Sequence, residues 1–411
     1  KRLKGKGEGG DPTEAGKDAT AQDGMGKSRE GQAAGSELPE DQMNKYEVNF
    51  HEVDQRLSYD ALYSGLWDRF LYYRDYDNVA SVWIITRLNM ESGDSQVFLD
   101  SEKLYFDLNS EGEIVKGQEE REAADIRSVE GFDITRDGGV IALIGMYSSE
   151  DSDVLRAAKN YRLAKFDSFG EPIWATEVED GAVPEVNFQL NVSADEEGNV
   201  ILSSQETSKH YLISREGKQI AEIPIEEETY LENNAKSEDG TLYLCMSKMR
   251  SGSGLSYELK KVDFRRGELS DVGDGSQTGI GSVFGKNELE SYLDSFLVYD
   301  QDILYGYSPS KAVKIPLVKW SLVDILGNEV KKVHLCQDKI FVLTMSMGKC
   351  EIAVLSPKKE GTAEKKTVKL AVIKKLSNIS QMVSDYNRSQ DQYRVEVVEY
   401  GKNTNGSAQW Q

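Results

Sequence analysis

The feature that most restricts the fold of this chain is a series of glycines that recur in pairs along its middle. The pairs are Gly138 with Gly170, Gly198 with Gly217, and Gly240 with Gly267. Each glycine lies in a short polar segment between two apolar stretches, where a tight hairpin turn requires a positive φ. The second glycines recur about every 50 residues, at the long end of the period of four-stranded propeller blades.

The segments around these glycines repeat one order: strand, turn, strand, loop, strand, turn, strand. The clearest copy covers residues 131–178, and two further copies begin at Phe188 and Asn234. Weaker copies flank them, at 81–115 and at 295–307. Many short strands joined by glycine turns are typical of closed all-β folds. The sequence therefore predicts a mainly β protein, a β-propeller of six to seven four-stranded blades.

The last repeat lacks one strand. Three strands are indicated at 332–336, 339–345 and 350–355, and no fourth follows them. A cleanly alternating segment, 46–53, precedes the first blade. We expect this N-terminal strand to complete the last blade, which closes the ring and removes an exposed sheet edge. The predicted propeller therefore spans 45–357.

One repeat carries a recognisable pattern. Asp167, Gly170 and Trp174 resemble part of the Asp-x-x-Gly-x-x-x-Trp motif of bacterial extracytoplasmic propellers of the tryptophan-docking and quinoprotein-like superfamily. The other repeats have Ile or Leu in place of the Trp. The resemblance implies the fold and not a quinone site, and we expect no cofactor.

Residues 1–44 differ in composition from the rest of the chain. Gly, Glu, Asp, Lys, Ala and Ser dominate them, and such a segment cannot bury enough apolar surface to offset its ordering entropy. We expect a disordered, acidic, Gly-rich tether. It resembles the spacer behind the lipid-anchored cysteine of Gram-positive surface lipoproteins, although that cysteine and a signal peptide are not in this sequence. The resemblance implies an extracellular protein anchored to the cell membrane through a lipid.

After a Lys/Glu/Gly-rich linker at 358–366, residues 367–411 indicate a second fold type. An apolar strand is followed by a helix and by a second strand, 393–400. The apolar positions of the helix share one face, at the spacing i, i+3, i+4, i+7. These positions are Ile379, Met382, Val383 and Tyr386. A parallel pair with a helical crossover needs further strands and covering helices, so we expect a truncated N-terminal piece of an α/β domain.

This C-terminal segment resembles the first βαβ unit of family 1 extracellular solute-binding proteins, the binding lipoproteins of ABC sugar importers. Tyr386-Asn387 at the helix end and the strand pattern Tyr393-x-Val395-x-Val-Val-x-Tyr carry the resemblance. It implies that the sugar-binding residues lie mostly outside this sequence and that an ABC permease is a candidate partner. Lys374-Lys375-Leu376 departs from the family, which usually has a Gly- or aromatic-containing loop there.

Charge and residue types exclude several classes of function. The chain has 49 Lys+Arg and 71 Asp+Glu, a net charge of −22, and either nucleic acid or an anionic membrane surface would repel it. His51, His210 and His334 fall within strand patterns and are interpreted as ordinary strand residues rather than bases or ligands. The acidic turns that begin at Asp75 and Asp195 are interpreted as solvated turns and not calcium loops. We therefore expect no catalytic residue and no metal site.

Three cysteines, Cys245, Cys336 and Cys350, are too few for a disulfide framework. Cys336 and Cys350 lie near each other in the last predicted blade, so a pair formed on oxidation is one interpretation. Free thiols buried in strands are the favoured alternative.

Aromatic residues gather near the start of the first blade. They are Tyr59, Tyr63, Trp67, Tyr72, Tyr73, Tyr76 and Trp83. Aromatic side chains stack on sugars and peptides and are enriched in binding sites. The alternative, which we favour, is that they fill space between the first blade and its neighbours, so no ligand-binding residue is assigned.

Three functions remain. The leading hypothesis is a surface-anchored, non-catalytic binding lipoprotein that captures a carbohydrate or another nutrient for an ABC importer. Its propeller would serve as an accessory binding or interaction module, with a sugar, a peptide or another surface protein as partner. The second hypothesis is a propeller scaffold for protein–protein interaction. The third is a propeller enzyme such as a glycoside hydrolase or lyase, whose carboxylates would converge on the central channel. We expect that the protein is not an enzyme.

Overall fold

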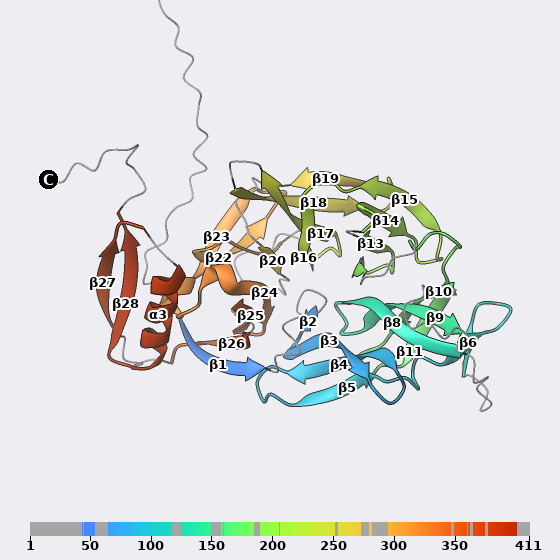
Figure 1. Ribbon diagram of the computed structural model, residues 1–411, viewed down its shortest axis with the longest axis horizontal. Coiled ribbons are helices and arrows are strands. Elements are labelled where there is room, and N and C mark those ends of the chain that lie inside the picture. The colour runs from blue at the N-terminus through green and yellow to red at the C-terminus, as the bar shows by residue number, and fades with distance from the viewer. Residues whose placement is uncertain are drawn as a thin grey trace, which may run out of the picture. The chain divides into compact units, whose positions relative to one another are not determined.

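Six four-stranded antiparallel sheets follow one another around a common axis and form a β-propeller (Figure 1). The structure is a computed structural model that describes residues 43, 45–53, 65–116, 125–148, 158, 160–184, 190–204, 206–250, 254–272, 279–281, 295–346, 349–359, 361, 365–374 and 377–400. The predicted mainly β propeller of four-stranded blades is confirmed, and the number of blades is six. The predicted tether apart from Met43, together with Tyr59 and Tyr63, lies outside the described residues.

The first three blades run from inner to outer strand along the chain. Blade 1 consists of β2 (Gly65–Trp67), β3 (Phe70–Asp77), β4 (Val82–Asn89) and β5 (Ser95–Leu99). Blade 2 consists of β8 (Asp125–Ile134), β9 (Val140–Ser148), β10 (Asn160–Phe166) and β11 (Pro172–Glu177). Blade 3 consists of β12 (Asn191–Ala194), β13 (Val200–Ser204), β14 (Lys209–Ile213) and β15 (Gln219–Pro224).

The other three blades complete the ring. Blade 4 consists of β16 (Thr229–Lys236), β17 (Leu242–Arg250), β18 (Gly254–Asp263) and β19 (Glu268–Val272). Blade 5 consists of β20 (Gly279–Gly281), β21 (Phe296–Tyr299), β22 (Ile303–Ser308) and β23 (Val313–Lys319). The 3-10 helices η2 (Trp320–Leu322) and η3 (Gly327–Glu329) then lead into blade 6.

Blade 6 is built from both ends of the propeller sequence. Its inner strands are β24 (Val330–Cys336), β25 (Lys339–Ser346) and β26 (Lys349–Pro357), and its outermost strand is β1 (Tyr46–Val53). β1 pairs antiparallel with β26 along its whole length. The strand that begins the propeller thus covers the edge that the end of the propeller would otherwise expose.

The turn glycines have the backbone that their positions in the sequence predict. All six glycines of the three pairs have a positive φ. Trp174 of β11 packs on Gly198 in the first turn of blade 3, where an added Cβ would lie 2.6 Å from the indole ring. The Arg215 guanidinium lies 4.9 Å from the centre of the same indole. The tryptophan of the docking-like motif therefore joins one blade to the next, and Gly198 leaves room for it.

One predicted part of the first blade lies elsewhere. Residues 103–115 were expected to belong to that blade, but β6 (Phe106–Leu108) and β7 (Ile114–Lys116) form a separate two-stranded sheet. Two buried arginines of blade 2, Arg127 and Arg162, both donate to the backbone oxygen of Phe106. These contacts hold the hairpin against blade 2, while β5 takes the fourth position of blade 1.

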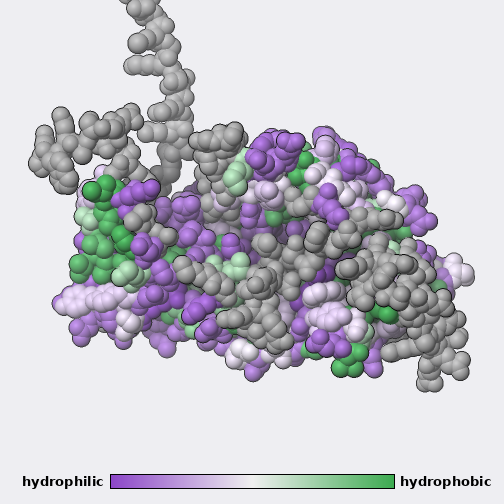
Figure 2. All heavy atoms as spheres, in the orientation of Figure 1, coloured by the Kyte–Doolittle hydropathy of each residue, from purple (hydrophilic) through white to green (hydrophobic). Residues whose placement is uncertain are grey.

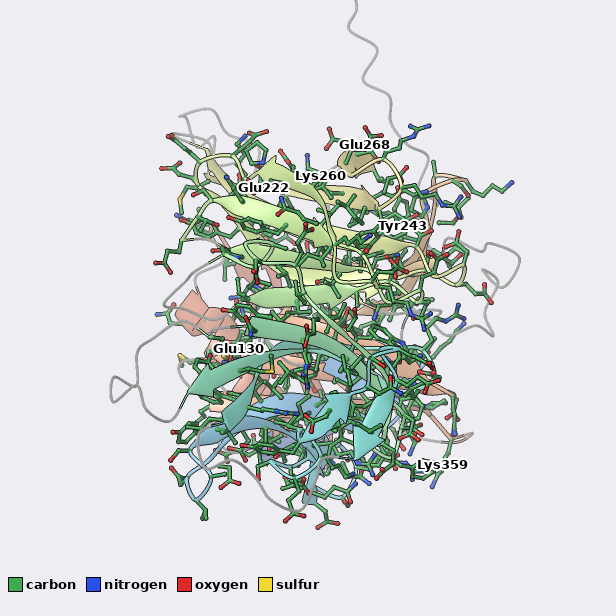
Figure 3. All side chains as sticks on the ribbon, turned by 90° about the vertical axis from the view of Figure 1, so that its right-hand side faces the viewer. Glu130, Glu222, Tyr243, Lys260, Glu268 and Lys359 are labelled. Carbon is green, nitrogen blue, oxygen red and sulfur yellow. The ribbon has the colours of Figure 1, made fainter. Side chains whose placement is uncertain are left out.

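The core lies between the blades. Middle strands such as β9 and β13 are buried on both faces, because each blade packs against a neighbour on either side. Outer strands carry the charges. The side chains of β15 and β19 are a mixture of half-buried and exposed ones, and Glu222 and Glu268, labelled in Figure 3, belong to these two strands. Such charged outer strands discourage pairing with other chains.

The C-terminal unit has the predicted order strand, helix, strand. β27 (Lys366–Val372) and β28 (Tyr393–Glu399) pair in parallel, and α3 (Ser377–Arg388) connects them. The side chain of Asn387, at the end of α3, donates to the backbone oxygen of Val395 (3.0 Å) and accepts from its N–H (2.7 Å). This asparagine ties the helix end to the middle of β28.

The apolar face predicted for α3 is not the face that the structure buries. Met382 and Tyr386 are exposed, whereas the polar Ser384 and Asn387 are buried. Ser384 donates to the backbone oxygen of Asp324 (3.0 Å), which follows blade 5. Hydrogen bonding to the propeller and to β28 therefore orients the helix, in place of the apolar stripe that its spacing indicates.

Ion pairs join the C-terminal unit to the propeller, and the buried carboxylate of Asp324 takes part in two of them. The Arg394 guanidinium of β28 donates to both of its oxygens (3.2 and 3.3 Å), and the Lys365 ammonium lies 3.7 Å away. Lys319 of blade 5 also pairs with Glu396 of β28 at 2.7 Å. A buried charge requires such partners, so this junction depends on charge complementarity.

The strands of the C-terminal unit leave apolar side chains in solvent. Val368, Leu370 and Ile373 are 50%, 41% and 72% exposed. Figure 2 shows an apolar surface over β27 and β28. No helix in the described parts of the chain is long and apolar enough to cross a membrane.

Candidate ligand-binding site in the central channel

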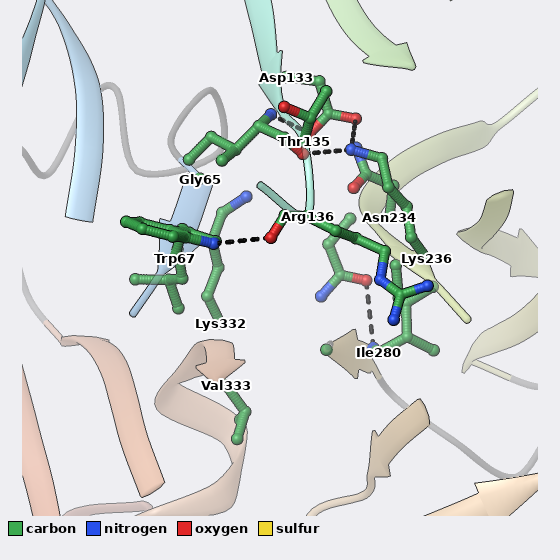
Figure 4. Close-up of a pocket in the computed structure, with 15 residues that line it drawn as sticks. Gly65, Trp67, Asp133, Thr135, Arg136, Asn234, Lys236, Ile280, Lys332 and Val333 are labelled. Atoms are coloured by element: carbon green, nitrogen blue, oxygen red, sulfur yellow. Dashed lines mark hydrogen bonds and ion pairs between the residues drawn. The ribbon is translucent and has the colours of Figure 1, made fainter. Parts of the chain in front are cut away.

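The inner strands of blades 1, 2, 4, 5 and 6 surround a pocket of about 80 Å³ on the propeller axis (Figure 4). Inner strands direct alternate side chains toward the channel, so residues distant in sequence meet there. The charged side chains that line it are Asp133 within β8, Arg136 in the turn after β8, Lys236 of β16 and Lys332 of β24. The pocket is therefore the point where three segments of the chain bring ionised groups together.

Asp133 and Lys236 form a buried ion pair in this pocket. The Lys236 ammonium lies 3.1 Å from Oδ2 of Asp133 and also donates to the backbone oxygen of Ile134. Oδ2 of Asp133 accepts from the N–H of Ala194 on blade 3 (2.8 Å). Because each charge has an opposite charge and further hydrogen bonds, the pair is stable in the interior and adds no net charge.

Lys332 lies beside this pair. In Figure 4 it extends from β24 toward the segment that carries Asp133 and Thr135. No described residue forms a hydrogen bond with its ammonium. Burial lowers the pKa of Lys332 to about 8, and the Asp133 carboxylate opposes part of that shift. Because Lys236 already pairs with Asp133, Lys332 gives the pocket a positive charge that the described part of the chain does not neutralise.

Arg136 and Trp67 form one side of the pocket. The Trp67 indole N–H donates to the backbone oxygen of Arg136 (3.1 Å), and the N–H of Arg136 donates to Glu196 (3.2 Å). The exposed Arg136 guanidinium donates to the backbone oxygen of Glu238. Since a guanidinium has five N–H groups, Arg136 retains donors for a ligand.

Two asparagines of β16 link the blades around the pocket. Asn233 accepts from the N–H of Ile280 (3.2 Å) and donates to the Tyr299 hydroxyl (3.0 Å), both in blade 5. Asn234 donates to the Ser193 hydroxyl of blade 3 (2.6 Å). The amides hold the inner strands in place, so the lining is built from hydrogen bonds between blades.

The local charge contrasts with that of the whole chain. Three cationic side chains and one carboxylate line the pocket, whereas the chain has a net charge of −22. A cationic pocket attracts anions, whereas the acidic surface around it repels them. The pocket has the charge and the free donors to bind a small carboxylate or a similar anion.

The residues singled out from the sequence do not meet in this pocket, with the exception of Trp67. His210 in β14 and His334 in β24 are buried, and burial lowers the pKa of each to about 4. His51 is half-buried in β1. The side chain of Asp195 accepts from two N–H groups of its own turn (2.8 Å each). Asp75 accepts from the N–H of Tyr76 (2.9 Å).

The three cysteines are free in this structure. Cys245 and Cys350 are buried and Cys336 is partly exposed. Burial raises the pKa of Cys350 to about 11. Burial, and next a hydrogen bond to Asp68, raise the pKa of Cys336 to about 12. Both remain protonated thiols at neutral pH.

The aromatic cluster is divided among different surroundings. Trp67 lines the pocket, Tyr72 is fully buried between blades 1 and 2, and Tyr76 packs edge-on against Trp83 (5.2 Å between ring centres). Successive side chains along β2, β3 and β4 point to opposite faces of the blade, so residues that are close in sequence have different neighbours. The favoured expectation, that they fill space between blades, describes Tyr72 and also Trp67, whose indole packs on Gly138 of blade 2 as well as lining the pocket.

The pocket itself was missed by reasoning from the sequence. Asp133, Lys236 and Lys332 come from three blades and share no local motif. The available signal was weak: Lys236 and Lys332 each lie in the first strand of a repeat, among residues that are otherwise mostly apolar or amide.

Neither a protein-family model nor a curated protein matches the chain. Solved structures match it in fold alone. Virginiamycin B lyase from Staphylococcus aureus is 10% identical, over 76% of this chain and 99% of the lyase, with a TM-score of 0.35. A gluconolactonase from Xanthomonas campestris is 13% identical, over 71% and 84%, with a TM-score of 0.36. The propeller domain of the Trilobed protease from Pyrococcus furiosus is 10% identical, over 77% and 86%, with a TM-score of 0.36.

These comparisons contradict one expectation. The expectation that the protein is not an enzyme does not stand as a conclusion, since solved propellers similar to the chain in fold include a lyase and a gluconolactonase. The shared feature is the fold, and a propeller of this kind does not exclude catalysis. The chain forms a propeller scaffold, similar in fold to those of proteins with several activities.

Proposed function

We propose that this protein is a solute-binding protein whose propeller captures a small carboxylate, such as a sugar acid, in the central channel pocket. The observation that carries the proposal is the Lys332 ammonium beside an Asp133–Lys236 pair that is already neutral. Arg136 retains N–H donors at the same pocket. Ionised donors that face an anion in a partly dehydrated pocket form strong, short hydrogen bonds.

The test is calorimetric titration of the protein with gluconate and glucuronate, with neutral glucose as the control solute. We expect the two acids to bind and glucose not to bind. Raising the salt concentration is expected to weaken binding modestly, because a partly buried charge is screened less than an exposed one. Equal binding of glucose and its acids would contradict the proposal.

A pair of lysines in one strand provides the matched variants. Lys332→Met removes the pocket cation and should weaken gluconate binding by roughly tenfold, about 1.4 kcal/mol. Lys331→Met removes a charge at the adjacent position, which does not line the pocket, and should leave the affinity within about twofold. Equal losses in the two variants would show that net charge and not the pocket governs binding.

A second candidate function is favoured by the parallel β27–α3–β28 unit. We infer that this unit begins a solute-binding domain in a surface-anchored lipoprotein that serves an ABC permease. Its support is the crossover geometry, with Asn387 bonded to Val395 at the end of the helix. Labelling intact cells with a membrane-impermeant amine reagent tests the location, and a native protein labelled only after lysis would contradict it.

A further inference from the structure

The channel contains two lysines with different surroundings. The Lys236 ammonium is held by the Asp133 carboxylate and by the Ile134 backbone oxygen. The Lys332 ammonium has no hydrogen-bond partner among the described residues, and it lines the same pocket. A lysine that is fixed in an ion pair keeps its proton, whereas a lysine without a partner in a partly dehydrated site can lose it. Lys332 therefore has the surroundings of a reactive amine.

We propose that Lys332 forms a reversible imine with the carbonyl carbon of a small oxo acid that binds in the channel pocket. This inference rests on the proposed function, since the carboxylate of the same solute would occupy the cationic pocket. A compound of this class offers two groups to the site: a carboxylate for the charged donors and an electrophilic carbon for the amine.

The pocket supplies donors for the carboxylate in addition to Lys332. Lys236 has three N–H groups, of which the described residues use two, and Arg136 has five, of which Glu238 uses one. These groups can retain the acid while Lys332 reacts. The volume of about 80 Å³ suits a single small acid and not an oligosaccharide.

The reaction needs no co-reactant. Lys332 first loses a proton to water in the channel, and its nitrogen lone pair attacks the carbonyl carbon. A C–N bond forms, the carbonyl π electrons move to oxygen, and one proton passes from the nitrogen to that oxygen, which gives a carbinolamine. The hydroxyl then takes up the proton released to water at the start and leaves as water while the nitrogen lone pair forms the C=N bond, and the resulting iminium gives its remaining N–H proton to water to become the imine. Burial lowers the pKa of Lys332 to about 8, so a substantial fraction of the side chain is the neutral amine in mildly alkaline buffer.

The experiment is reductive trapping on the unmodified protein. The protein is incubated with pyruvate and cyanoborohydride at pH 8, digested, and the modified lysines are quantified by mass spectrometry. We expect the carboxyethyl adduct on Lys332 at roughly tenfold or more above Lys236 and above Lys331, its neighbour in β24. Labelling spread evenly over these lysines would overturn the inference.

Two variants keep the test specific. Lys332→Arg keeps the charge but has no amine, and it should remove the adduct from the peptide that contains residue 332. Lys331→Arg, a matched change at a residue outside the pocket, should leave the labelling of Lys332 unchanged. Circular dichroism melts of both variants establish that they are folded. Loss of labelling in both would overturn the assignment to Lys332.

Calorimetry with lactate, which has the carboxylate but no carbonyl, separates this inference from the proposed function. If lactate and pyruvate bind and pyruvate labels Lys332, both stand. If both bind and no lysine is labelled, anion capture stands and the imine inference fails. If neither binds, both fail.

Discussion

Strands β26 and β27 have similar local sequences and opposite environments. Each contains a run of apolar residues that follows a charged one, Glu351 or Lys369, yet β26 is buried through its centre, between β1 and β25, whereas β27 is exposed at every position except its last. The difference comes from neighbours: β26 has a strand on both sides and a blade packed on its face, while β27 has one partner strand, β28, in the part of the chain that the structure describes. Apolar sequence therefore indicates a strand, and the fold around it determines how much stability that strand contributes.

The largest difference is expected from truncating one leucine in each strand. Leu355 in β26 is fully buried, and Leu370 in β27 is 41% exposed. Leu355→Ala should lower the free energy of unfolding by about 2–5 kcal/mol, because it leaves a cavity in a packed core. Leu370→Ala should cost less than about 1 kcal/mol. Urea denaturation of both variants measures this, and equal losses would mean that β27 is buried in solution.

Acid should lower the stability of the propeller before that of the C-terminal unit, because all three histidines of the chain lie in the propeller. The pKa of buried His210 is lowered to about 4, so the unfolded chain takes up a proton near pH 6.5 while the folded chain does not. The stability that the neutral, buried His210 contributes is thus fully present above pH 6.5 and is lost as the pH falls toward 4. The loss from His210 alone should be about 2 kcal/mol between pH 7 and 5.

The matched variants for this pH effect are His210→Gln and His51→Gln, at a buried and a half-buried strand position. The first should flatten the dependence of the unfolding free energy on pH between 7 and 5, and the second should leave it steeper. Denaturation curves at several pH values measure the slopes. An unchanged slope in His210→Gln would contradict a neutral, buried His210.

The smallest effect concerns the junction between the two regions. Asp324→Asn removes the charge that pairs with Arg394 and Lys365, and asparagine tolerates the positive φ of 56° at this position. We expect the opening free energy of β28 to fall by about 1–2 kcal/mol in hydrogen exchange, because Arg394 loses a buried partner. The protection of blade strands should change little.

The control for that junction is Asp302→Asn, which changes an exposed carboxylate near the same blade. It should leave the exchange of β28 unaltered. Protection of β28 that is equal in Asp324→Asn and in the unmodified protein would show that the ion pairs of Asp324 do not hold the unit in place.

The blades could be predicted because their signals are local. A positive φ at Gly138 or Gly198 is a property of a few consecutive residues, and it marks a hairpin wherever the blade lies. The pocket could not be predicted in the same way, because Asp133, Lys236 and Lys332 meet only after the ring closes. The prediction of the buried face of α3 failed for a related reason. The apolar spacing of the helix is local, but Ser384 and Asn387 are buried by partners that lie outside the helix.

The closure of blade 6 has a consequence for synthesis of the protein. β1 emerges from the ribosome first and its partner β26 last among the propeller strands, with Tyr46 paired to Pro357. Until β26 appears, β1 has no edge to join and the ring stays open, so the channel and its pocket cannot assemble during most of translation. A contact between such distant residues is slow to form and leaves apolar strands exposed to other chains for that period. Chaperone binding during synthesis should therefore concentrate on the nascent propeller before residue 357 is released.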